Sequence, residues 1–130
     1  MALLKYTLAQ FKNPESEYNN QYYAKATYDE VIDLDGLVVH MANHNTPFSQ
    51  GTISGVLKDM VSCIRELLLD SKKVKLDDLA IFALGLKGSF AETEEDFSVN
   101  ENIKGARITA RGTGEFSSKQ LALDTKLSRK

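Results

Sequence analysis

Near its start the chain alternates apolar and polar residues, and it then changes to a helical spacing. Residues 3–11 and 22–32 mix aromatic, β-branched and other apolar residues with partial alternation, so we predict two β-strands there. The polar segment between them contains an Asn-Pro pair at residues 13–14, which favours a turn because proline fixes φ. From Asp33 the apolar positions lie three and four residues apart, which predicts a helix that ends near Pro47.

A longer helix is predicted next, and its apolar stripe is the most regular pattern in the chain. Ser49 is a suitable N-cap. Gly55 lowers the helix propensity, so we expect a close contact with another helix at that position. Cys63 lies at the edge of the stripe without a neighbouring base, and we interpret it as a small buried hydrophobe. The stripe consists of Ile53, Val56, Leu57, Met60, Val61, Ile64, Leu67 and Leu68.

The second half of the chain returns to strand patterns. Residues 72–88 alternate and then become almost continuously apolar, with a turn predicted at Asp77-Asp78. Residues 103–111 alternate so that Arg107, Thr109 and Arg111 share one face of a strand. We interpret residues 92–96 as a solvated loop, and "SSKQLALDTKL" as a short terminal helix capped by Ser117 or Ser118.

Composition is that of one soluble domain. The 130 residues are 42% hydrophobic and 26% charged, and no apolar run is long enough to span a membrane. Lys5 interrupts the first apolar stretch and no cleavage site follows it, so we expect no signal peptide. With a single cysteine, this indicates a reducing, intracellular setting.

Charge is distributed unevenly along the chain. The net charge is −2, but residues 1–100 hold 9 Lys and Arg against 15 Asp and Glu, whereas residues 101–130 hold 7 against 3. Cations on one strand face can neutralise phosphates and release counterions. An edge strand also carries positive charge simply to discourage strand addition, and the charge pattern alone leaves both interpretations open. The candidate phosphate-binding residues are Lys104, Arg107, Arg111, Lys119, Lys126 and Arg129, with Lys72, Lys73 and Lys75 as a second cluster.

The sequence gives only weak indications of metal binding or catalysis. His40 and His44 are four residues apart on the first predicted helix, but no third metal ligand is placed near them. No nucleophile, base and orienting group converge, so we predict no catalytic residues, no metal site, no cofactor and no small-molecule substrate.

Several local strings together resemble the histone-like HU/IHF DNA-binding family, in particular the longer HU-related proteins of Bacteroidetes-type bacteria. They are the early "NP", "QYY", "VKLDDLAIF", "ETEEDF" and "NIKGARI". The resemblance implies an α+β, IHF-like fold with two helices packed on a β-sheet, a β-ribbon and a short C-terminal helix, preceded by an extra pair of strands. We therefore predict a single domain, with residues 1–32 as the strand extension and 33–130 as the HU/IHF-like body.

Two features depart from the family pattern. The HU-type pattern has a glycine on each side of the aromatic residue before "TF", whereas "DLAIF" has Asp78 and Ala80 in this region. The family's arm carries a basic string with a proline at its tip, whereas residues 88–102 are acidic and contain no proline. Bending of DNA by a proline wedge is therefore unsupported, and we expect Phe90 and Phe97 to pack on the core.

The resemblance implies a non-enzymatic, nucleoid-associated protein of the bacterial cytoplasm that binds double-stranded DNA through its phosphates as a homodimer. Arg107 and Arg111 are expected to make the principal contacts and Lys104 an auxiliary one, with the remaining cations adding long-range attraction. The alternative is an HU-like scaffold that has lost DNA binding and serves as a dimerisation or protein-interaction module. An enzyme is the third class.

Overall fold

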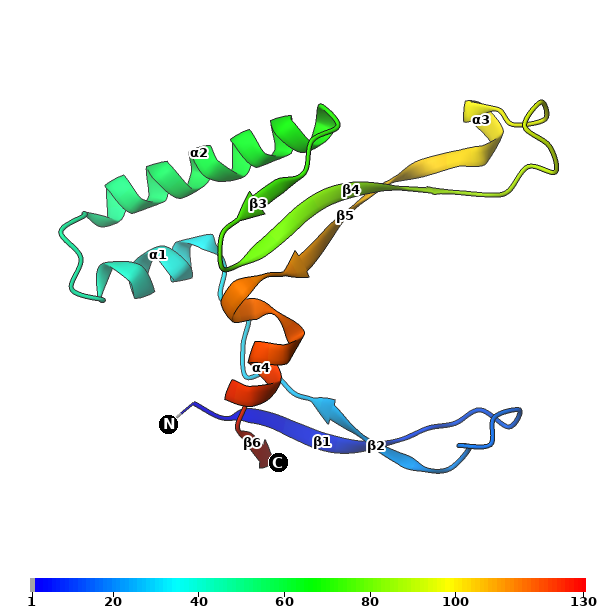
Figure 1. The fold of residues 1–130 in the computed structure, drawn as a ribbon. Helices are drawn as coiled ribbons and strands as arrows, with labels where there is room; N and C mark the ends of the chain where they lie inside the picture. The colour runs from blue at the N-terminus through cyan, green and yellow to red at the C-terminus, as the bar shows by residue number, and fades with distance from the viewer. Residues whose placement is uncertain (1) are drawn as a thin grey trace.

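The strands form two separate three-stranded sheets (Figure 1) in the computed structural model, which describes residues 2–130. One sheet contains β1 (Leu4–Gln10), β2 (Tyr22–Ala26) and β6 (Leu127–Arg129) in the order β2-β1-β6. The other contains β3 (Val74–Leu76), β4 (Ala80–Gly88) and β5 (Ile103–Gly112) in the order β3-β4-β5. The predicted mixed α+β class is confirmed.

Three of the four helices begin directly after predicted capping residues. The helices are α1 (Leu34–Ala42), α2 (Gln50–Leu69), α3 (Val99–Asn102) and α4 (Ser118–Asp124), with a 3₁₀ turn, η1 (Gly114–Phe116), before α4. Helix α3, with Ser98 as its N-cap, was not predicted. Asp33 Oδ1 accepts a hydrogen bond of 2.9 Å from the Gly36 N–H, and Ser49 Oγ accepts one of 3.1 Å from the Thr52 N–H. Ser117 Oγ caps α4 in the same way. These bonds satisfy N–H groups that have no partner within a helix.

The core of the chain is thin. Helix α1 packs on α2, and α2 packs on β3 and β4. Within residues 2–130, the buried apolar side chains are Val38, Ile53, Leu68 and Ala80. Two expectations about α2 are wrong: no atom lies within 4 Å of a Cβ built on Gly55, so no close helix contact requires it, and Cys63 is exposed rather than buried.

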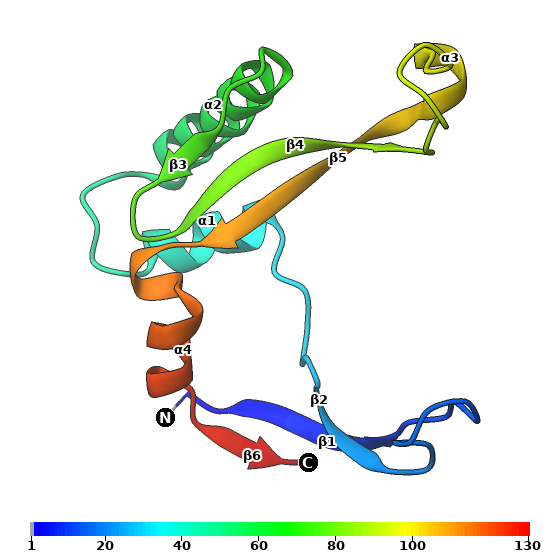
Figure 2. The same ribbon diagram turned by 45° about the vertical axis from the view of Figure 1, so that its right-hand side comes forward.

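The C-terminal segment returns to the N-terminal sheet, which the sequence did not predict. β6 pairs in parallel with β1, placing Leu4 opposite Leu127 and Tyr6 opposite Arg129. In Figure 2 this sheet lies beyond α4, away from α1 and α2. The division at residue 32 stays a prediction, and β6 shows that the N-terminal sheet also includes the last strand.

Strands β4 and β5 form a long antiparallel ribbon that extends away from the helices to a closed end (Figure 1). We call residues 89–102 at this end the tip. Asn102 is only 8% exposed, and its side chain accepts a hydrogen bond of 2.9 Å from the Ser98 N–H and donates to Ser89 Oγ and to the Phe90 carbonyl. The tip is therefore a hydrogen-bonded structure. The expectation that Phe90 and Phe97 pack on the core is wrong, because both lie in the tip, where Phe90 is fully exposed and Phe97 is 47% exposed.

Gly114 is expected to be essential for the stability of the turn after β5. Its φ of +56° disfavours any residue with a Cβ, and a Cβ there would lie 2.9 Å from the Cα of Asp78. We expect Gly114→Ala to lower the free energy of unfolding by about 2 kcal/mol or more in urea titration. Gly55→Ala, in open space within α2, is the matched control and is expected to raise it by about 1 kcal/mol. An equal effect of both substitutions would contradict this.

Candidate nucleic-acid interface

The two faces of the β3-β4-β5 sheet differ sharply in chemistry. Register places Arg111 opposite Ile81, Arg107 opposite Gly85, and Lys75 opposite Ile81. Directly paired residues lie on the same face of a sheet, and residues two apart along a strand share that face. One face therefore holds a row of cations, whereas the alternate positions Phe82, Leu84 and Ile108 line a groove beside α2.

Four cations define what we call the basic face: Lys75, Lys87, Arg107 and Arg111. Lys75 and Arg111 stand two strands apart in one row, about 10 Å from each other. Arg107 lies about 13 Å further along β5, and Lys87 stands opposite Gly105, two residue pairs or about 7 Å beyond Arg107. The basic face is thus about 20 Å long. Arg107 and Arg111 lie on the same face, as their alternation predicted.

The basic face contains no carboxylate at its strand positions. The intervening residues are Ile81, Ala83, Gly85, Gly105 and Thr109. A Cβ on Gly85 would lie 4.0 Å from Arg107 Nε, so the arginine side chain extends across the neighbouring strand. Neither salt bridge found in residues 2–130 involves any of the four cations. Their charges are therefore available to an anionic partner.

The other predicted cations lie in three different places. Lys104 is at the irregularity where the register shifts near Lys87 and Gly88. Lys72 forms a salt bridge with Asp70, and Lys73 is in the connection between α2 and β3. Lys119 is on α4, Lys126 precedes β6, and Arg129 is in β6 on the other sheet. Of the second predicted cluster, only Lys75 joins the basic face.

Lys87 belongs to the basic face although it was not among the predicted residues. It continues the alternation Ile81, Ala83, Gly85 along β4, and this alternation was visible in the sequence. What the sequence lacked was the register between β4 and β5, which places Lys87 next to the row of arginines.

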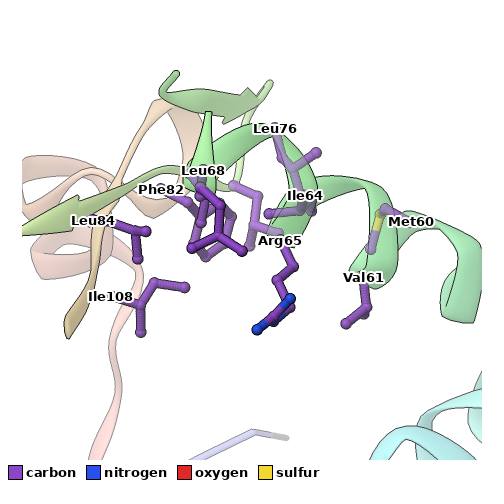
Figure 3. Close-up of a pocket in the computed structure, with 11 residues that line it drawn as sticks. Met60, Val61, Ile64, Arg65, Leu68, Leu76, Phe82, Leu84 and Ile108 are labelled. Carbon is purple, nitrogen blue, oxygen red and sulfur yellow. The ribbon is translucent and has the colours of Figure 1, made fainter. Parts of the chain in front are cut away.

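The opposite face of the sheet is apolar and largely uncovered. Between α2 and the sheet lies an open groove of about 520 Å³ (Figure 3), in which Leu84 and Ile108 project from the sheet and Met60 and Val61 from α2. Ile108 is 61% exposed and Val61 54% exposed. Continuous apolar patches of this kind are typical of surfaces that contact a protein, a membrane or a ligand.

The whole chain has far more surface than a monomer of its mass. It exposes 11022 Å², whereas a folded monomer of 14.5 kDa exposes about 6,900 Å². The exposed area in excess of this value is larger than the area of about 800 Å² that one partner buries in an ordinary protein–protein interface.

The described part of the chain contains neither a cluster of metal ligands nor a helix that could span a membrane. The rings of His40 and His44 lie 4.5 Å apart, but residues 2–130 contain no group of three His, Cys, Asp or Glu side chains arranged to hold a metal ion. Within that range no helix combines the length and the apolarity needed to cross a bilayer.

A family model described as "HU domain fused to wHTH, Ig, or Glycine-rich motif" matches residues 1–121. The chain belongs to this HU domain family. The predicted family resemblance is thereby confirmed. The match covers all the strands except β6 and ends within α4.

A solved structure with the same fold comes from Bacteroides vulgatus ATCC 8482 and is described as a "Putative bacterial DNA binding protein". The two chains share 13% sequence identity with a TM-score of 0.71, over 98% of this chain and 47% of the other. The chain thus spans about half the length of this neighbour. No curated protein sequence matches it.

Proposed function

We propose that this chain is a non-enzymatic, nucleoid-associated protein of the bacterial cytoplasm that binds double-stranded DNA through backbone phosphates, without strong sequence specificity. The observation that carries the proposal is the basic face. Four cations stand on one face of the sheet, with no carboxylate among the strand positions around them. The HU-type family and the description of the Bacteroides vulgatus protein as DNA binding support the same partner.

The geometry of the basic face suits phosphates better than base edges. Duplex DNA carries one charge per 1.7 Å of helix axis, so a face about 20 Å long lies along about 6 base pairs. Between the cations stand Ala83, Gly85 and Gly105, which offer no side-chain donor or acceptor to read a base pair, and Thr109, whose hydroxyl donates to the Ala83 carbonyl. Phosphate contacts of this kind position a protein on DNA without carrying sequence information. Binding is therefore driven by counterion release.

We further propose that the functional unit is a homodimer formed through the apolar groove. A second copy would cover Leu84, Ile108 and Val61 with the same side chains of its own, as a two-fold interface requires. Because the groove and the basic face are opposite sides of one sheet, dimerisation leaves the cations exposed. The surface excess over a monomer supports an extensive interface of this kind.

Equilibrium binding to unrelated duplexes tests the proposed function. Fluorescence anisotropy is measured at 50 mM salt with three 20-base-pair duplexes of random, A·T-rich and G·C-rich sequence. We expect all three dissociation constants to agree within about fivefold, because phosphates are common to all three. A preference of more than about 100-fold for one duplex would show base readout, and absence of binding to any duplex would contradict DNA binding.

The second candidate function, a protein-interaction module, is favoured by the tip. Residues 89–102 contain five carboxylates and no Lys or Arg, so the end of the arm suits a basic protein surface. If the chain binds none of the three duplexes but is dimeric in light scattering, the module becomes the better description.

A further inference from the structure

We propose that the tip acts as an electrostatic stop, which keeps duplex DNA off the end of the arm and confines it, unbent, to the basic face. The inference rests on the proposed function. It assigns a role in setting the DNA contact to the tip carboxylates Glu92, Glu94, Glu95, Asp96 and Glu101.

Charge changes sign abruptly along the ribbon. Lys87 and Lys104 are the last cations before the tip, and from Gly88 to Ile103 every charged residue is acidic. All five carboxylate residues are exposed, and neither salt bridge in residues 2–130 involves them. A phosphate backbone that follows the basic face outward therefore meets uncompensated negative charge in the tip, where Glu101 stands two residues before Ile103 and Glu92 four residues after Gly88.

The tip presents these charges from a defined structure. The buried Asn102 side chain bonds to Ser98, Ser89 and Phe90, and the Ser89 N–H donates a bond of 2.9 Å to the Asn102 carbonyl. Gly88 permits this closure, since a Cβ there would lie 1.9 Å from the Asn102 carbonyl oxygen. With both ends of the loop bonded to each other, the carboxylates are held at the end of the ribbon.

Phe90 provides the strongest alternative, since a fully exposed aromatic side chain at an arm's end could insert into DNA. Its position argues against insertion. Glu92 is two residues away, so its Cα lies within about 7 Å of that of Phe90. This is inside the screening length of about 10 Å at 0.1 M salt. Insertion of Phe90 would bring carboxylates against the phosphates on either side of the groove.

Neutralising the tip tests the proposal. Glu92→Gln, Glu94→Gln, Glu95→Gln and Asp96→Asn are combined, and affinity is measured by anisotropy at 50 mM salt. DNA bending is measured by energy transfer between dyes at the two ends of a 30-base-pair duplex. We expect the variant to bind about tenfold more tightly, because it loses four charges close to the phosphates. When the wild type binds, we expect the efficiency of energy transfer between the two dyes to stay at the value of free DNA, because the duplex is not bent.

The matched control removes four carboxylates elsewhere, through Glu15→Gln, Glu17→Gln, Glu30→Gln and Asp59→Asn, all at exposed positions outside the tip. It changes net charge equally and is expected to alter affinity less than threefold.

The proposed electrostatic stop is overturned if the tip variant binds no better than this control, or if the wild type bends the duplex and Phe90→Ala abolishes the bend. If only the tip variant binds DNA, the stop stands and the proposed function of the wild type fails. If neither binds, both proposals fail.

Discussion

Replacing Arg107 and Arg111 together by alanine is expected to weaken binding to a 20-base-pair duplex about 100-fold at 50 mM salt. Both guanidinium groups lie on the basic face, and each contributes counterion release with a slope of about 0.9 per phosphate. Losing two phosphate contacts lowers the slope of log affinity against log salt by about 1.8. If the two proteins bind equally at 1 M salt, this difference in slope makes the affinity of the variant about two orders of magnitude lower at 50 mM salt. Anisotropy titration of wild type and variant measures the difference.

The matched control for the arginine pair is Lys25→Ala with Lys58→Ala. It removes the same charge from β2 and α2, at exposed positions outside the basic face. We expect its affinity to stay within about threefold of wild type, since exposed charges beyond a screening length interact weakly. Equal losses in the two variants would show that DNA responds to net charge and not to the basic face.

Ile108→Asp is expected to convert a dimer into a monomer. Ile108 stands in the apolar groove, so the substitution places a carboxylate where a second copy would bury an apolar side chain. Burying an unpaired charge is far more costly than one interface contact can offset. The side chain is 61% exposed within one chain, so the fold of the monomer does not depend on it. Light scattering at about 10 μM gives the oligomeric state, and circular dichroism checks the fold.

Thr109→Asp is the control for the groove because it places the same carboxylate one residue away, on the opposite face of β5. It is expected to remain dimeric and to lose DNA affinity, because it lies between Arg107 and Arg111. A dimeric Ile108→Asp variant, or a monomeric Thr109→Asp variant, would contradict the assignment of the two faces.

Local signals in the sequence predicted most elements of the fold. Asp33, Ser49 and Ser117 cap the helices they were expected to cap, because an N-cap depends only on the residues of the first turn. The alternation of residues 103–111 correctly predicted which side chains of β5 share a face, since strand periodicity is also a local property.

Features that depend on distant pairing could not be predicted in this way. β6 has three residues and pairs with β1 across the whole chain, so nothing in "LSR" alone identifies a strand. Lys87 and Lys75 join the arginines only through the registers β4-β5 and β3-β4. Cys63 and Phe90 were expected to be buried because they are apolar, but a chain with so thin a core leaves both exposed.

The salt dependence of DNA affinity tests the central claim most directly. Dissociation constants for the wild type and a random 20-base-pair duplex are measured between 50 and 200 mM salt. If the four cations of the basic face each neutralise one phosphate, log K falls by about 3.6 for each unit of log salt, and by more if both copies of a dimer contact the duplex. A slope shallower than about 1, or no saturable binding at 50 mM salt, would contradict the account.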